Sequence, residues 1–243
     1  MADTSVALVT GGSRGIGRAI ATRLAVNGAQ VVVNYRDNAD AAREVVADIE
    51  AVGGRAAAVR ADITDADQLR SVFDFAAETF GGLDILVANA GIARFAPLAE
   101  ATDDDFDTLF RANTRATFLA LREATHRLRD GGRIIVISSG ATVTSRPGTA
   151  LYAASKAAVE QLARVAAREL GPRGITVNSV LPGATRTDAL ETQVSAAALA
   201  QAAEQIPLGR LGLPDDIAAI VGFLASAEGG WITGQTIHAG GLF

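Results

Sequence analysis

The fold is decided by an early stretch of the chain, Ser5-Val6-Ala7-Leu8-Val9-Thr10-Gly11-Gly12-Ser13-Arg14-Gly15-Ile16-Gly17. Its first half is a short apolar run, which is typical of a buried strand. Its second half is a glycine turn that enters a segment of helical periodicity ending at Asn27-Gly28. Glycines let the backbone approach a pyrophosphate, and the first N–H groups of the helix bind it. The stretch therefore predicts a nucleotide-binding α/β unit.

The same alternation of strand and helix continues along the chain. Further strands are predicted at 31–35, 55–63, 83–88, 133–137, 175–180 and, with its turn, 233–241. Helices are predicted at 39–52, 65–80, 151–170, around 190–205 and, with its cap, at 208–224. Such alternation produces a parallel sheet built of βαβ units. No linker or change of composition interrupts it, so we expect residues 1–243 to form one domain.

Composition excludes several classes of function. The net charge is −5 without any basic block, which argues against nucleic acid or an anionic membrane as partner. There are no cysteines, and the two histidines, His126 and His238, lie far apart, which argues against a zinc site. The N-terminus lacks the pattern of a signal peptide, and no apolar run approaches the roughly 20 residues of a membrane span. A cytoplasmic protein is expected.

A second informative stretch runs from Ser138 to Lys156. Ser139 follows the apolar run 133–137, and open α/β sheets bind ligands at that end of a strand. Tyr152 and Lys156 are four residues apart and share one helix face. An ammonium beside a phenol lowers the pKa of the phenol from about 10, which suits a proton donor to a carbonyl or an acceptor from an alcohol. Such pairs also occur on helices by chance, so the rest of the chain must support the assignment.

The residues at the end of the second strand indicate whether the cofactor is NAD or NADP. NAD enzymes usually carry an acid there for the ribose hydroxyls, whereas this chain has Tyr35 and Arg36, with Arg14 in the glycine turn. Two guanidinium groups favour a 2′-phosphate and hence NADP. The alternative is that Arg36 is a solvated surface charge, and the nearby Asp37 leaves NAD open.

Taken together, the motifs resemble those of the short-chain dehydrogenase/reductase family. They span nearly the whole chain in the family's order: the glycine turn 10–17, Asp62-Ile63, Asn89-Ala90-Gly91, Asn113, Ser139, Tyr152-x-x-x-Lys156 and Pro182-Gly183. The resemblance implies a Rossmann-type, doubly wound sheet of about seven parallel strands with helices on both faces, usually in tetramers. It also implies an NAD(P)(H)-dependent oxidoreductase.

The family's residue roles carry over to the matching positions. Tyr152 would be the general acid or base, and Lys156 would hold the nicotinamide ribose and lower the phenol's pKa. Ser139, rather than Ser138, would bind the substrate oxygen, and Asn113 would support a water near the lysine. The resemblance, with the arguments above, gives these cofactor-binding residues: Gly11, Ser13, Arg14, Gly15, Ile16, Gly17, Tyr35, Arg36, Asp62, Ile63, Asn89, Ala90, Gly91, Tyr152, Lys156, Pro182, Gly183 and Thr187.

In the family, the segment 184–207 is a mobile substrate lid. Here it is small and mostly uncharged, with Arg186, Asp188, Glu191 and Glu204 as the exceptions. Phe95 and Val143 would line the pocket, with Arg94 and Arg146 at its border, so we expect a neutral or moderately apolar ketone. The helix predicted at 151–170 is apolar around much of its circumference, which favours burial against a partner subunit and a homotetramer.

Three functions follow from this reading. The leading one is an NADPH-dependent ketone reductase, including the 3-oxoacyl-thioester type. The second is a sugar, polyol or other alcohol dehydrogenase of the same fold. The third is a non-catalytic NADP-sensing protein, which would have no need for Asn113, Ser139, Tyr152 and Lys156 together.

Overall fold

Seven short strands form one parallel sheet in the computed structural model, which describes residues 4–187, 190, 192 and 195–241. The sheet order is β3-β2-β1-β4-β5-β6-β7. The strands are β1 (Val6–Val9), β2 (Gln30–Tyr35), β3 (Arg55–Arg60), β4 (Ile85–Ala88), β5 (Arg133–Ile137), β6 (Thr176–Pro182) and β7 (Thr236–Ala239). This confirms the predicted Rossmann-like parallel sheet with helices on both faces.

The sheet changes its winding direction beside β1. Val9 pairs with Val33 of β2 on one side and with Val87 of β4 on the other. The chain leaves β1 toward β2 and β3, and later returns to add β4 to β7 on the opposite side. In open α/β sheets the crevice at such a point, outside the carboxyl ends of the strands, is where ligands bind. The topology therefore places a candidate site where β1 and β4 end.

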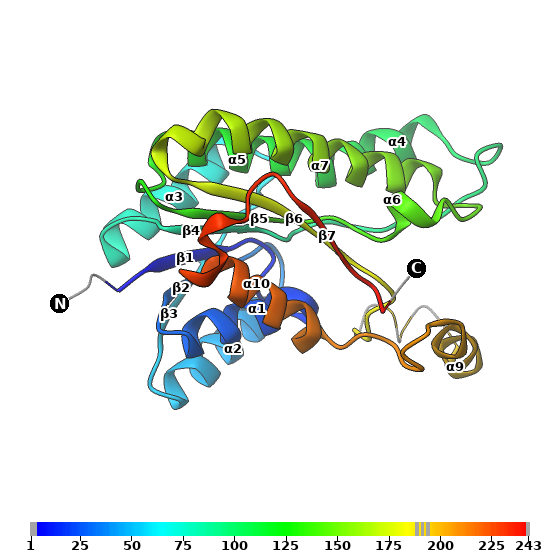
Figure 1. The fold of residues 1–243 in the computed structure, drawn as a ribbon, viewed down its shortest axis with the longest axis horizontal. Helices are drawn as coiled ribbons and strands as arrows, with labels where there is room; N and C mark the ends of the chain where they lie inside the picture. The colour runs from blue at the N-terminus through cyan, green and yellow to red at the C-terminus, as the bar shows by residue number, and fades with distance from the viewer. Residues whose placement is uncertain (1–3, 188–189, 191, 193–194, 242–243) are drawn as a thin grey trace.

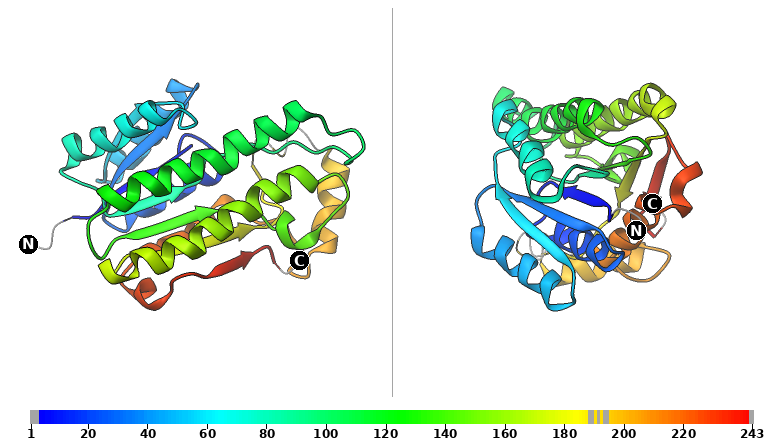
Figure 2. Two further views of the ribbon diagram at one scale, coloured as in Figure 1. Left: turned by 90° about the horizontal axis from the view of Figure 1, so that it is seen from above. Right: turned by 90° about the vertical axis from the view of Figure 1, so that its left-hand side faces the viewer.

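Helices cover both faces of the sheet (Figures 1 and 2). One face carries α1 (Gly15–Val26), α2 (Ala39–Ala51) and α10 (Pro214–Ala225). The other carries α3 (Ala66–Phe80), α4 (Asp103–Leu109), a π-helical turn η1 (Phe110–Arg115), α5 (Ala116–Arg127) and α7 (Ala150–Leu170). The short α6 (Ala141–Thr144) and α9 (Ala196–Gln205) lie at the end of the molecule where the strands point (Figure 1).

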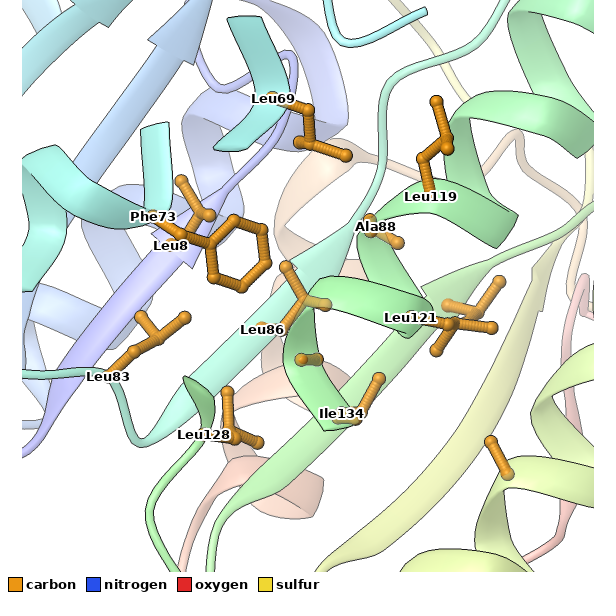
Figure 3. Close-up of a cluster of buried hydrophobic side chains, with 14 of the residues drawn as sticks. Leu8, Leu69, Phe73, Leu83, Leu86, Ala88, Leu119, Leu121, Leu128 and Ile134 are labelled. Atoms are coloured by element: carbon orange, nitrogen blue, oxygen red, sulfur yellow. The ribbon is translucent and has the colours of Figure 1, made fainter. Parts of the chain in front are cut away.

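The two faces of the sheet form two cores because the central strands are buried on both sides. Figure 3 shows the core beneath α3 and α5, where Phe73 lies among Leu8, Leu86 and Ile134. Alternate strand residues such as Val9 belong to the core beneath α1 and α10. Burying each large apolar side chain contributes about 1.5–3 kcal/mol, which fixes the strand register that the site depends on.

Helix ends follow local capping rules. The Asp65 side chain accepts hydrogen bonds from the N–H groups of Asp67 and Gln68 at the start of α3, and Gly81 ends that helix with a φ of 85°. Asn38 caps α2 in the same way. These ends agree within one residue with the helices predicted at 65–80 and 39–52.

Two predicted segments differ in the structure. The third strand ends at Arg60 rather than residue 63, because the Asp62 N–H donates to Gln68 Oε1 and the Thr64 N–H to the Asp62 carboxylate, which turns the chain toward α3. In the segment 184–207, the structure has α9 from Ala196. Residues 188, 189, 191, 193 and 194 of the expected lid, with Asp188 and Glu191 among them, lie outside the described residues.

The single tryptophan, Trp231, ends a 3₁₀ turn, η3 (Glu228–Trp231), and is 99% exposed. Its neighbour Gly230 lies beside the Arg133 guanidinium at the start of β5. This is the end of the sheet where the strands begin, opposite the crevice. No helix in the described part of the chain is both long and apolar enough to span a membrane.

Candidate active site

The glycine turn after β1 forms a cradle into which side chains do not fit. A Cβ on Gly17 would lie 2.2 Å from the Gly11 carbonyl oxygen. α1 starts at Gly15 with Arg14 at its N-cap, and it has neither a side-chain cap nor an acid in its first turn. The first N–H groups of α1 are thus available to an anion, and the helix dipole favours one there. The cradle fits the pyrophosphate of a dinucleotide, with Ser13 buried in it and Ile16 half-buried.

The end of β4 holds this turn in place. The Asn89 Nδ2 donates to the carbonyl oxygens of Thr10 and Gly11 at 2.9 and 3.1 Å. The Thr10 hydroxyl accepts in return from the backbone N–H groups of Asn89 and Ala90 at 3.0 and 3.1 Å. Asn89 and Ala90 therefore lie beside the glycine turn, and the Asn89 amide acts as a brace for the turn.

A cavity of about 520 Å³ opens at the ends of β2 and β3. It is lined by Arg36, Asp37, Arg60, Asp62 and Gln68. Arg36 pairs with Asp37 at 2.7 Å (Nε to Oδ2), and Arg60 Nε donates to the Arg36 carbonyl oxygen at 3.0 Å. Two guanidinium groups thus border one cavity, a donor set that suits a phosphate.

Arg60 and Gln68 were missed by the sequence reasoning. A signal for Arg60 existed in the strand pairing, because β2 and β3 run in parallel register with Tyr35 opposite Arg60. Two strands that end at the same level place their terminal side chains together. Tyr35, predicted to contact the cofactor, is half-buried at this point.

Asp62 and Ile63 lie on the turn between β3 and α3, with Ile63 buried. Partial burial alone would raise the pKa of Asp62. Hydrogen bonds from Thr64 and the positive charges of Arg36 and Arg111 outweigh this and hold the pKa below its usual value. The carboxylate is therefore ionised at neutral pH and is a hydrogen-bond acceptor at the rim of this cavity.

Ser139 and Tyr152 meet beyond the end of β5. Their hydroxyl groups form a hydrogen bond, and Ser139 Oγ also accepts from the Ala141 N–H at 3.2 Å. Burial raises the pKa of Tyr152, and the bond with Ser139 opposes this only in part. The expected lowering of this pKa by Lys156 is not found, because the surroundings of Tyr152 in the chain alone are dominated by loss of water.

Lys156 is the only lysine of the chain, and it is buried on α7 one helical turn after Tyr152. Its Nζ donates to the Ile137 carbonyl oxygen at 2.9 Å. Burial lowers its pKa to about 8. A Cβ on Gly91 would lie 3.0 Å from this Nζ and 2.8 Å from Asn113 Oδ1, so a glycine is required where the loop after β4 passes the lysine.

Asn113 lies in the π-helical turn η1, a kind of irregularity that is frequent at functional sites. Its amide is fully engaged. Oδ1 accepts from the Ile92 N–H at 2.8 Å, while Nδ2 donates to the Ile92 carbonyl oxygen at 3.0 Å and to Ser155 Oγ at 2.9 Å. The Asn113 side chain thus joins η1, the loop after β4 and α7.

Ser155 completes this connection and was also missed by the sequence reasoning. It is fully buried, and its hydroxyl donates to the Tyr152 carbonyl oxygen at 2.8 Å. The signal was its position next to Lys156 on the helix. One hydroxyl thus links the turn that carries Asn113 to the helix that carries Tyr152 and Lys156.

The structure separates the two adjacent serines after β5. Ser138 is buried, and its hydroxyl donates to Glu160 Oε1 at 2.7 Å, away from Tyr152. Glu160 is itself buried on α7 one turn beyond Lys156, and the sequence reasoning had not assigned it a role. Of the two serines, Ser139 is the one whose hydroxyl faces the tyrosine.

The end of β6 closes the site from the other side. The Pro182 carbonyl oxygen accepts from the Gly140 N–H at 2.8 Å. Gly183 packs against Gly240, and the Thr187 Cγ2 lies 3.4 Å from where a Gly15 Cβ would be. Thr187 thus faces the glycine turn, and the contacts described above bring residues at the ends of β1, β4, β5 and β6 to the same end of the sheet. No cluster of three or more potential metal ligands occurs among the residues described.

Comparisons with known proteins agree with this geometry. A family model described as "Enoyl-(Acyl carrier protein) reductase" matches residues 11–242. A versicolorin reductase of Emericella nidulans is 44% identical over 254 residues, covering 99% of this chain and 96% of the relative. A hydroxynaphthalene reductase-like protein of Metarhizium brunneum is 44% identical over 245 residues, covering 96% and 92%. A short-chain dehydrogenase of Burkholderia cenocepacia, solved in complex with NADP, superposes with a TM-score of 0.92 at 45% identity, covering 99% and 98%.

Proposed function

Because the chain belongs to the short-chain dehydrogenase/reductase family of oxidoreductases, we propose that it reduces a ketone to a secondary alcohol with NADPH. The observation that carries the proposal is the Ser139–Tyr152 hydrogen bond, with the buried Lys156 one turn along the helix from Tyr152. It presents two hydroxyl groups to one point, which is what a carbonyl oxygen that gains negative charge requires. The relatives named as reductases support this direction of reaction.

Bound NADPH would supply the hydride, and the chain's own residues would manage the oxygen and its proton. Ser139 and Tyr152 would hold the carbonyl by hydrogen bonds to its oxygen, and Tyr152 would then give that oxygen its proton. Since burial raises the pKa of Tyr152, the phenol keeps its proton at neutral pH, the form that an acid needs. Lys156, with a pKa of about 8, is mainly an ammonium at pH 7 and would stabilise the phenolate left behind.

The residues of the crevice would hold the cofactor as follows. The N-terminus of α1 and the glycine turn would bind the pyrophosphate, and Asp62 with Ile63 would border the adenine. Arg14, Arg36 and Arg60 would bind a 2′-phosphate, which is why we propose NADP rather than NAD. The relative that binds NADP supports this choice.

We also propose a homotetramer in the cytoplasm, with residues 1–243 as one domain and 184–207 as the lid. The support for association is apolar surface on adjacent helices. Phe118 of α5 and Val165 of α7 are exposed although both are apolar, and they leave a face that a second copy could cover. Native mass measured at micromolar concentration tests this, and a monomer would contradict it.

The test of the activity is consumption of NADPH and of NADH with small ketones, β-keto esters, 3-oxoacyl thioesters and an enoyl thioester. We expect turnover of carbonyl compounds with NADPH. Tyr152→Phe should lower kcat by about 10²–10⁴-fold, the usual contribution of a positioned acid. The variant should still bind NADPH, as measured by the fluorescence of NADPH. Retained binding would show that the variant has lost its acid and not its fold.

The other outcomes discriminate between the remaining functions. Oxidation of polyols with NADP⁺, without reduction of any ketone, would favour an alcohol dehydrogenase. Tight NADPH binding without turnover in either direction would favour a sensor. Turnover of the enoyl thioester alone would contradict the proposal, because hydride would then add to a carbon–carbon double bond and no ketone would be reduced to an alcohol.

A further inference from the structure

A second, larger cavity reaches Tyr152 through Phe95, and its lining includes Phe95 and Arg146, which the family resemblance placed at the substrate pocket. Its volume is about 760 Å³, within the range of sites for small organic molecules. Two loops form it, one following β4 and one preceding α7, and the Ala96 N–H ties them by donating to the Gly148 carbonyl oxygen at 3.0 Å. Ala150 and Ala153 on the first turn of α7 supply its floor.

The lining of this cavity is mainly apolar. Phe95, Pro97, Leu98 and Pro147 contribute to it, and Phe95 and Leu98 remain 59% and 71% exposed. Large apolar side chains held open to solvent around a hollow are typical of a binding site. Among the residues that the structure describes, Arg146 is the one charged residue of the lining, and none of them brings a carboxylate to the cavity. The chemistry of this lining therefore favours an apolar ligand over a cationic one.

Phe95 connects this cavity to the reacting centre. Its ring meets the Tyr152 ring edge to face, with 5.5 Å between centroids and 82° between planes. The same side chain lines the cavity. A ligand whose carbonyl oxygen reached the Tyr152 hydroxyl could therefore extend along Phe95 into the cavity.

The rim of the cavity contains a residue that is held in a strained backbone conformation. Ser145 has a φ of 48°, the only positive φ of a non-glycine residue in the part of the chain that the structure describes. Backbone held in this region costs of order 1–3 kcal/mol and tends to occur at ligand-binding sites. The Thr149 hydroxyl fixes the turn by donating to the Arg146 carbonyl oxygen at 2.6 Å.

We propose that this cavity is a substrate subsite that takes a flat, apolar ring system attached to the reacting carbonyl, with Phe95 as the wall shared with Tyr152. The inference rests on the proposed ketone reduction and adds the class of substrate. A planar ring packs against the faces of Phe95 and the two prolines, and it needs no hydrogen bonds from the lining.

The experiment compares two ketones with NADPH in three proteins. The ketones are 2-tetralone, in which the carbonyl is part of a fused bicycle, and ethyl acetoacetate, which has no ring. The proteins are wild type, Ala150→Phe, which fills the cavity from its floor, and Ala154→Phe. Ala154 is an exposed alanine of the same helix that does not line the cavity, so it serves as the matched control.

We expect Ala150→Phe to lower kcat/KM for 2-tetralone by at least about tenfold, mainly through KM, because burial of an aromatic ring is worth at least that factor. Ethyl acetoacetate should change less than about twofold, and Ala154→Phe should change neither ketone. If Ala150→Phe does not fold, Ala153→Leu enters the same cavity one turn along and takes its place.

Three results would overturn the inference. Equal effects of Ala150→Phe on both ketones would show that the cavity does not discriminate between them. Unchanged kinetics with both would show that the cavity lies off the substrate's path. A change in native mass without a change in selectivity would show that a second copy of the chain covers the cavity. If wild type reduced neither these nor any other ketone, the proposed function would fail first, which is a separate outcome.

Discussion

Lys156, which the proposed reaction needs, is expected to lower the free energy of unfolding of the protein. Its pKa falls from the ordinary value of 10.5 to about 8 because it is buried with a neutral carbonyl as its hydrogen-bond partner. Between about pH 8 and pH 10.5, the lysine keeps its proton in the unfolded chain and has lost it in the folded chain. Stability therefore rises with pH across this window, and below it the folded state carries the full cost of the buried ammonium. Replacement by an uncharged side chain of similar length, Lys156→Met, removes that cost.

The size of the gain follows from the pKa. At about 1.36 kcal/mol per pKa unit, the fall from 10.5 to about 8 corresponds to about 3 kcal/mol. The hydrogen bond to Ile137 is lost in the variant, which costs about 1 kcal/mol. We therefore expect Lys156→Met to raise the free energy of unfolding by about 2 kcal/mol at pH 7. For a chain of this length that is a gain of roughly 4–8 °C in Tm, with activity abolished.

The assay is urea or thermal unfolding of the apo protein between pH 6 and pH 10, followed by far-ultraviolet circular dichroism. The gain should be constant below about pH 8 and should shrink as the pH rises toward 10.5. Arg168→Met, which removes an exposed cation from the same helix, is the matched control and should stay within about 0.5 kcal/mol of wild type.

The pKa itself can be measured because the chain has a single lysine. Protein labelled with ¹³C-lysine gives one side-chain Cε signal that needs no assignment, and its titration should have a midpoint near pH 8. A midpoint near 10.5, or a Lys156→Met variant no more stable than wild type at pH 7, would refute the reasoning that burial governs this residue.

Three further predictions concern activity, cofactor choice and packing. The kcat/KM for ketone reduction should fall above about pH 8, as Lys156 loses its charge, rather than near pH 10, because burial raises the pKa of Tyr152; a pH profile in which Lys156→Arg keeps the same alkaline limb would contradict this. Arg60→Ala should raise KM for NADPH about tenfold and leave KM for NADH within about twofold, since a charge-assisted hydrogen bond is worth about 1.5–3 kcal/mol; equal effects on both cofactors in initial-rate assays would argue against a phosphate contact. Ser155→Ala should lower the free energy of unfolding by about 1–3 kcal/mol, because Asn113 Nδ2 loses a buried acceptor, and a denaturant titration that gives wild-type stability would exclude that role.

Much of the fold is readable from local patterns. Apolar runs such as 133–137 and glycine-ended helices such as 65–80 determine their own structure, because burial and capping act over a few residues. The third strand was predicted too long, since a side chain–backbone bond from Gln68, six residues along the chain from Asp62, ends the extended conformation. Such a bond depends on where the following helix packs, which no local pattern contains.

The candidate site divides in the same way. Tyr152 and Lys156 could be paired from helical spacing alone, and Ser139 from its place at a strand end. The environment that sets their pKa values could not be predicted from the sequence, because burial depends on everything packed around them. No helix was predicted around Asn113, where a π-helical turn directs its amide to Ile92 and Ser155.

The position of Trp231 has a practical consequence for anyone who handles this protein. A lone indole that is already in water has little emission change to give when the chain unfolds, so fluorimetry excited at tryptophan will report poorly on folding. The same indole would respond strongly to any molecule that covers it. If its emission shifted toward the blue as the protein concentration rises, at unchanged circular dichroism, copies of the chain would be meeting at the end of the sheet where the strands begin, remote from the crevice.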